Sequence, residues 1–237
     1  MASLRVDTFV PRVWRRSPWM AEIAATAARF DGCEGWPEVA SYGCAAAPVR
    51  FVEQRVGSSA GAYDARIVQH GEVLTRARCW HDFFNAMIWC TFPRAKMALH
   101  RRLSANTPAI RPPGGRTRAQ DLWTILDEGG VLLVAPAASH EALRAEIAAQ
   151  EPVHRGGARL ERLPRHRAVA FGHALLEHVV VGAAVARASA ILVAEEALTG
   201  AMNLSLDAWL EEHLSGAGEL FAGGRIGYPV APLGLAR

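Results

Sequence analysis

The fold is decided by residues 80–92, WHDFFNAMIWCTF, where apolar side chains occupy nearly every position. A helix that is apolar on almost all sides usually lies at the centre of a protein. We therefore expect a buried central helix over residues 80–91. Phe92-Pro93 ends this helix, because proline removes a backbone hydrogen bond and clashes with the preceding turn. A second helix then runs through Lys96 to Leu103.

The remaining elements are predicted outward from this stretch. Helices are indicated by helical periodicity and capping residues, and strands by runs in which apolar and polar residues alternate. Ser17 is placed to N-cap a helix that starts at Pro18, and either Asn203 or Ser205 to cap the last helix. The expected helices lie at residues 18–31, near 37, and at 80–91, 93–103, 118–128, 139–150, 170–181 and 205–214. The expected strands lie at 49–56, 63–69, 72–75 and 131–134, and 191–194 fits a strand or a helix.

The arrangement of these elements predicts an α+β fold, alpha-rich and single-domain over residues 1–237, with a small antiparallel sheet that contains a hairpin. The hairpin would join residues 63–69 to 72–75 across His70-Gly71. Residues 104–117 and 151–167 are expected to be exposed connections, and residues 216–237 an irregular tail.

Composition and missing motifs exclude several classes of protein. With 237 residues, 51% hydrophobic and 21% charged, the chain has enough apolar side chains for a core of its own. It contains no GxGxxG, GxxxxGK[ST] or GxSxG motif. Nothing in the sequence therefore supports a nucleotide cofactor or the nucleophile elbow of a serine hydrolase. The four cysteines form no CxxC pair, and we expect them reduced. No secretory signal or membrane span is evident, which predicts a cytoplasmic protein.

Polar residues inside the apolar helices are the informative feature. His81 and Asn85 lie one turn apart on the 80–91 helix, and burying each would cost about 1–3 kcal/mol unless it finds a partner. Asp82 points elsewhere. On the 170–181 helix, His173 and Glu177 form a second pair one turn apart.

If the two helices face each other, their polar pairs form one site. His81, His173 and Glu177 would then supply two imidazoles and a carboxylate, a set able to bind zinc, iron or manganese. Asn85 would orient water in this arrangement. A metal is not required, since the same residues could act as acid and base. In a plain structural reading, both pairs are hydrogen-bond clusters that lock the helices together.

Several segments are similar to an uncharacterised bacterial family catalogued as domain of unknown function 3025. The resemblance rests on residues 80–89 and 92–96, and on YDARIVQHGEVLTR (63–76), DLWTILDEG (121–129) and FGHALLE (171–177). It assigns no activity, but it implies that eight polar residues match family motifs. They are His81, Asp82, Asn85, Lys96, Asp127, Glu128, His173 and Glu177.

Two main functions compete. The first is a hydrolase-type enzyme acting on an unidentified small molecule, with His81, His173 and Glu177 as acid, base or ligands and Lys96 attracting an anionic substrate. The second is a non-catalytic binding or assembly module. A nucleic-acid-binding protein is a lesser alternative, since five arginines between Arg155 and Arg167 could hold phosphates, either alone or as part of a ββα-metal nuclease.

Overall fold

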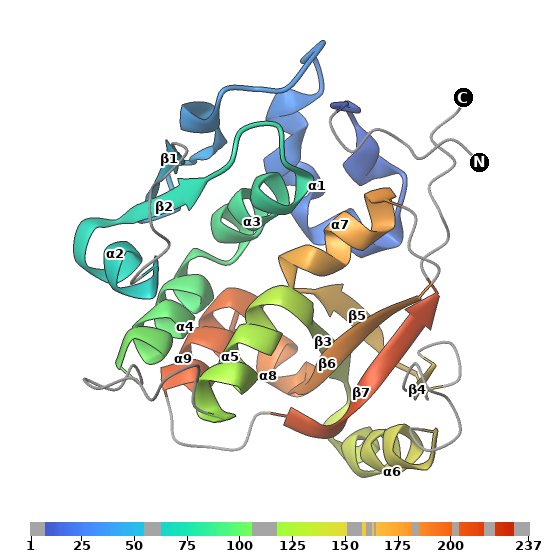
Figure 1. The fold of residues 1–237 in the computed structure, drawn as a ribbon. Helices are drawn as coiled ribbons and strands as arrows, with labels where there is room; N and C mark the ends of the chain where they lie inside the picture. Colours follow the sequence, from blue (N-terminus) through green and yellow to red (C-terminus); the bar gives the residue numbers. More distant parts are fainter. Residues whose placement is uncertain are drawn as a thin grey trace.

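The computed structural model describes residues 8–54, 63–105, 118–150, 158–159, 163, 165–181, 185–200, 204–215 and 221–229. Within these ranges the chain folds as helices around two sheets, one of two strands and one of five (Figure 1). The prediction of an alpha-rich α+β fold is confirmed. None of the described helices is both long and apolar enough to cross a bilayer.

The N-terminal segment consists of short helices packed on an aromatic core. Ser17 accepts a hydrogen bond from the Trp19 amide at 3.3 Å, which confirms the predicted cap. The helices are the 3₁₀ segments η1 (Val13–Arg15), η2 (Pro18–Met20), η3 (Ala28–Phe30) and η4 (Val39–Tyr42), and the α-helix α1 (Ala21–Ala27).

The predicted hairpin is wrong. Residues Tyr63–His70 form helix α2, which connects strand β1 (Arg50–Glu53) to strand β2 (Glu72–Thr75), and the two strands are parallel. Parallel neighbours need a crossover rather than a tight turn, and α2 provides it. The helix ends at Gly71, which has a φ of +63° and whose amide donates a hydrogen bond to the Ile67 carbonyl.

The central helix α3 spans Trp80–Thr91, as predicted, and α4 (Pro93–Ala105) follows it. Nine of the twelve residues of α3 are buried, which explains its apolar faces. Its Trp80 and Phe83 stack on rings from the N-terminal segment, among them Phe9 and Trp14. This packing fixes the position of His81 between the two aromatic residues.

The second half of the chain builds the five-stranded sheet. Its strands are β3 (Gly130–Ala135), β4 (Ala158–Arg159), β5 (Arg167–Ala170), β6 (Val185–Ala194) and β7 (Phe221–Pro229), in the order β4-β7-β6-β3-β5. The helices are α5 (Arg118–Gly129), the 3₁₀ segment η5 (Ala137–Ser139), α6 (His140–Gln150), α7 (His173–Val181), α8 (Glu195–Thr199) and α9 (Leu206–Ser215). Figure 1 shows α7 between α3 and the sheet.

Three expectations for this half need correction. The sheet is mixed rather than antiparallel, because β3 pairs with β6, and β4 with β7, in parallel. Residues 167–170 form β5 beside β3, so the helix predicted from residue 170 begins at His173. Residues 221–229 of the predicted irregular tail form β7, antiparallel to β6. Much of the two predicted connections, residues 104–117 and 151–167, lies outside the described residues. Arg155, Arg162 and Asn203 also lie outside them.

Candidate metal centre

Helices α3 and α7 pack against each other and bring their histidines together. The Nε2 atoms of His81 and His173 are 3.0 Å apart, and the two rings meet edge to face with centroids at 4.4 Å. His173 is almost fully buried, whereas the His81 side chain is 24% exposed. The cluster is therefore reachable from solvent on the His81 side.

A carboxylate from a third helix completes the cluster. Glu128 lies in the last turn of α5, and its Oε2 is 3.6 Å from Nε2 of His81 and 3.5 Å from Nε2 of His173. Its side chain is 43% exposed, so it forms the open side of the group. His81, Glu128 and His173 are the described residues whose ligand atoms come close enough together to hold one ion.

Glu177 contacts the opposite nitrogen of His81. Its Oε2 lies 3.0 Å from Nδ1 of His81 and accepts a hydrogen bond from the Nδ1–H group. Nε2 of His81 thus keeps a free lone pair toward the cluster when the ring is neutral. The sequence predicted Glu177 as the third ligand, but in the structure Glu128 holds the position beside both Nε2 atoms, and Glu177 orients the ring of His81.

A close backbone contact sets the distance between α5 and α7. The amides of Phe171 and Gly172 both donate to the carbonyl of Gly130, at 3.0 and 2.9 Å. A Cβ atom at Gly172 would lie 2.5 Å from the Glu128 carbonyl oxygen and from the amide nitrogens of Gly129 and Gly130. Only glycine permits this approach, and the approach places His173, the next residue, beside Glu128.

The geometry of the three ligand atoms fits a small divalent ion. Ligands bonded to zinc at about 2.0–2.2 Å in a tetrahedron lie about 3.3–3.6 Å from one another. The two separations from Glu128 Oε2, 3.5 and 3.6 Å, lie in this range, and the two Nε2 atoms are slightly closer to each other, at 3.0 Å. The contact between Glu177 and His81 also matches the carboxylate that commonly orients a metal-bound histidine through its other nitrogen.

The two histidines of the cluster differ in the direction of their pKa shifts. The hydrogen bond to Glu177, with the nearby charges of Glu128 and Glu177, raises the pKa of His81 against the effect of burial. Burial, with a smaller contribution from the Lys96 charge, lowers the pKa of His173 to about 3, so this ring is neutral. Burial raises the pKa of Glu128. Without an ion, a protonated His81 can donate a hydrogen bond from its Nε2–H group to Nε2 of His173.

Behind the cluster lies a buried ion pair. The Lys96 ammonium, with no exposed surface, donates to Asp127 and to Oδ1 of Asn85 at 2.9 Å. Burial alone would raise the pKa of Asp127, but the Lys96 charge and the hydrogen bond from Lys96 lower it far below its ordinary value. Lys96 therefore neutralises Asp127 and is out of reach of a substrate at the surface.

The remaining predicted residues have other partners. Nδ2 of Asn85 donates to the Tyr63 hydroxyl at 3.3 Å, so its amide belongs to the Lys96 network. Asp82 accepts from the Arg76 guanidinium and backbone amide, at the start of α3. The cluster thus unites His81, His173, Glu128 and Glu177, while Asp82, Asn85, Lys96 and Asp127 make contacts around it.

Sequence reasoning missed one member of the buried network. His100 on α4 is almost fully buried, its Nδ1 lies 2.8 Å from Asp64 of α2, and its ring stacks on Trp89 at 5.3 Å. The available signal was its position four residues after Lys96, which places the two side chains on one face of α4. These contacts tie α2 and α3 to α4.

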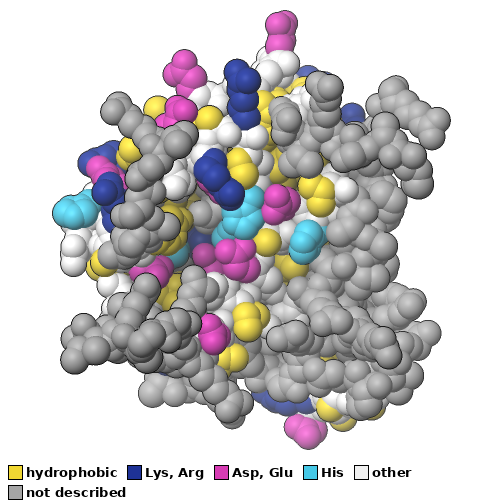
Figure 2. All heavy atoms as spheres, viewed as in Figure 1, with side chains coloured by type: hydrophobic (Ala, Val, Ile, Leu, Met, Phe, Trp, Pro, Cys, Tyr) yellow, Lys and Arg dark blue, Asp and Glu magenta, His cyan; other side chains and the backbone are white. Residues whose placement is uncertain are grey.

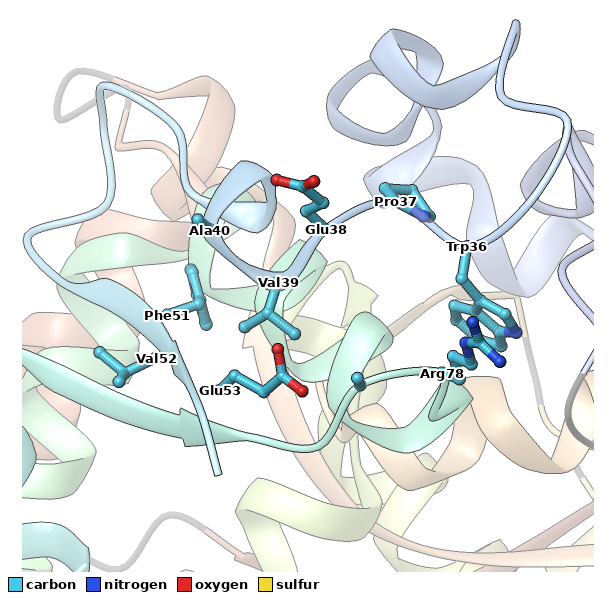
Figure 3. Close-up of a pocket in the computed structure, with 10 residues that line it drawn as sticks. Trp36, Pro37, Glu38, Val39, Ala40, Phe51, Val52, Glu53 and Arg78 are labelled. Carbon is cyan, nitrogen blue, oxygen red and sulfur yellow. The ribbon is translucent and has the colours of Figure 1, made fainter. Parts of the chain in front are cut away.

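The face that carries the cluster is visible in Figure 2. Histidine side chains in its middle are bordered by Asp and Glu side chains, over the place where α3, α5 and α7 meet in Figure 1. A pocket of about 260 Å³ adjoins Glu128 there. A larger pocket of about 580 Å³ lies elsewhere, with Trp36 and Arg78 at one end and Val52 at the other (Figure 3). No residue of the cluster lines the larger pocket.

Comparison with known families extends the resemblance seen in the sequence. The model of a protein family of unknown function, DUF3025, matches residues 49–236. The chain belongs to this family. The matched region contains every residue of the His-Glu cluster and of the Lys96 network. No curated protein and no solved structure matches the chain.

Proposed function

We propose that this member of DUF3025 is a metal-dependent enzyme of hydrolase type. His81, His173 and Glu128 would hold a divalent ion, with zinc favoured over iron and manganese by the near-tetrahedral spacing. The observation that carries the proposal is the convergence of three ligand atoms from three helices at 3.0–3.6 Å, with a carboxylate behind one imidazole.

The chemistry of such a centre follows from its ligand set. Zinc with two histidines and one glutamate acts in known sites as a Lewis acid on water and on carbonyl groups. In this chain, Glu177 holds the tautomer of His81 that leaves Nε2 unprotonated. The buried and neutral His173 contributes its nitrogen without a prior loss of a proton. The exposed side of Glu128 leaves room for a substrate.

Metal binding is the first test. Purified protein, stripped with a chelator, is titrated with zinc, iron(II) and manganese(II) by isothermal titration calorimetry. We expect one ion per chain, with zinc bound most tightly, and a loss of at least 100-fold in affinity in His81→Asn and Glu128→Gln. His70→Asn, an exposed histidine at the end of α2, serves as the matched control. Equal zinc affinity in all four proteins would refute the metal centre.

Activity is the second test. A panel of neutral esters and amides, including p-nitrophenyl butyrate, is assayed with the zinc-loaded protein. We expect hydrolysis that disappears on removal of zinc and in Glu128→Gln, and persists in His70→Asn. Zinc binding without hydrolysis of any panel member would count against the hydrolase assignment.

The second candidate is a structural or assembly role, favoured by the buried Lys96-Asp127 pair. Under that role, the histidines would stabilise the contact between α3 and α7, and zinc would bind no better to the native protein than to His81→Asn. The Arg155–Arg167 segment lies largely outside the described residues, and one of its described arginines, Arg167, pairs with Glu22.

A further inference from the structure

The pocket beside Glu128 lies where α5, α7 and β6 pack together. Ile125 and Glu128 line it from α5, Ala174 and Leu175 from α7, and Ala188 from β6. Glu128 therefore belongs to both the pocket and the His-Glu cluster, so a molecule in the pocket would lie next to any ion held by the cluster.

The walls of this pocket are mostly apolar. Glu128 is the one charged side chain among the described residues that line it. Its polar groups are His178, whose buried Nδ1 has no hydrogen-bond partner within the described part of the chain, and Ser189. An anionic group would meet the Glu128 carboxylate without a neighbouring cation in the pocket wall, which disfavours it.

The volume indicates the size of the group that the pocket can hold. An apolar cavity of about 150 Å³ binds benzene, and pockets for drug-sized molecules begin at about 300 Å³. At about 260 Å³, this pocket lies between the two. It is large enough for a single ring or a short alkyl chain with one polar atom.

We propose that this pocket binds the uncharged apolar group of the substrate, a short alkyl chain or one ring, with the bond to be cleaved at the His-Glu cluster. The inference rests on the proposed function and narrows its substrate class to neutral acyl compounds, esters or amides of small apolar acids. The net reaction adds water across the acyl bond and yields the free acid and an alcohol or amine.

The pocket can be tested without metal and without activity. Binding of hexanamide to the metal-free protein is followed by NMR through the methyl groups of Ile125 and Leu175. We expect saturable shifts, a loss of at least tenfold in affinity in Ala174→Leu, which fills the pocket, and no change in Ala21→Leu, an exposed alanine on α1. The absence of shifts in the unmodified protein would overturn the proposal.

A chain-length series then links the pocket to the reaction. With p-nitrophenyl acetate, butyrate, hexanoate and octanoate, kcat/KM should rise about fourfold per methylene until the pocket is full. The rise in kcat/KM should end at a shorter acyl chain in Ala174→Leu and at a longer acyl chain in Ile125→Ala. Identical length profiles in the unmodified protein and both variants would contradict the assignment.

Zinc affinity separates this inference from the proposed function. Ala174→Leu should bind zinc as the unmodified protein does, which also shows that the variant folds. If hexanamide binds but zinc does not, the pocket is real and the metal centre is wrong. If zinc binds and hexanamide does not, the metal centre stands and the substrate class is wrong.

Discussion

Lys96 shows at the scale of one residue how this protein buries charge. Its ammonium is shielded from solvent, donates to Asp127 and Asn85, and lies 5.4 Å from the centre of the Trp89 ring. Removing one partner of such a buried pair leaves an uncompensated charge, whereas replacing both with apolar residues is often close to neutral.

Lys96→Met should therefore destabilise the protein by about 3–5 kcal/mol. The double variant Lys96→Met/Asp127→Leu should recover most of that loss, because neither charge remains. Urea unfolding followed by circular dichroism gives the free energy of unfolding for each protein. A double variant as unstable as Lys96→Met would show that the loss comes from packing and not from the unpaired carboxylate.

Glu177→Gln tests the residue that orients His81. The amide keeps the shape of the side chain but removes the charge that holds the Nδ1 proton, so zinc affinity should fall about 10- to 100-fold. Calorimetric titration with zinc measures this change, and Glu34→Gln, an exposed glutamate, is the control. A loss as complete as in Glu128→Gln would instead make Glu177 a direct ligand.

At the scale of elements, the N-terminus of α7 is locked against the end of α5 by Gly172. The contacts that a Cβ atom would make there are all with backbone atoms, which cannot move aside as a flexible side chain can. The distance between His173 and Glu128 therefore depends on the absence of a side chain at one position.

Gly172→Ala should push α7 away from the junction of α5 and β3, destabilise the protein by about 1–3 kcal/mol and weaken zinc binding. Gly35→Ala is the matched control, since no atom lies within 4 Å of the position of its Cβ. Thermal unfolding and zinc calorimetry measure both effects. Unchanged zinc affinity in a folded Gly172→Ala protein would show that the cluster tolerates this displacement.

The sequence predicted those elements whose pattern is local. Helix α3 was located from its continuous apolar run, and the cap at Ser17 from its side chain and the following proline. Residues 63–69 carry β-prone side chains beside the His70-Gly71 turn, which is typical of a hairpin strand, but they form helix α2, with Tyr63 and Ile67 one helical turn apart. Strand β7 was missed because a Gly-rich segment gains its hydrogen bonds from distant β6.

The site was predictable in part for the same reason. His81, His173 and Glu177 stood out as polar residues on apolar helices, which is a local property. The choice between Glu177 and Glu128 as the carboxylate beside both Nε2 atoms depends on how α5 and α7 meet. That contact depends on two glycine-containing turns far apart in the chain, so no spacing in the sequence reports it.

For the whole molecule, the buried neutral His173 makes stability depend on pH. Its pKa is about 3 when folded and about 6.5 when unfolded, so only the unfolded chain gains its proton between these values. As far as His173 is concerned, the protein has its full stability above pH 6.5, and it loses stability as the pH falls from 6.5 toward 3. Asp127, whose pKa is also lowered by folding, adds a further loss below about pH 4. His81, with its raised pKa, stabilises the fold below pH 6.5 and loses that effect at higher pH.

The metal-free protein should therefore lose about 1 kcal/mol of stability per pH unit between pH 6 and pH 4. Urea unfolding at half-unit steps measures the slope. His173→Gln removes the group responsible and should flatten the dependence, even if it lowers stability overall. An equal slope in this variant would assign the acid sensitivity to other residues.

The order of strands in the larger sheet has a consequence for biosynthesis. Strand β7 separates β4 from β6 although it is the last of the five to be translated, and in the described residues β4 pairs with β7 alone. At about 5–20 residues per second, a ribosome takes roughly 2–7 s to pass from the end of β6 to the end of β7. During that interval, the place of β7 between β4 and β6 is unfilled, and a chaperone or a neighbouring nascent chain could bind there.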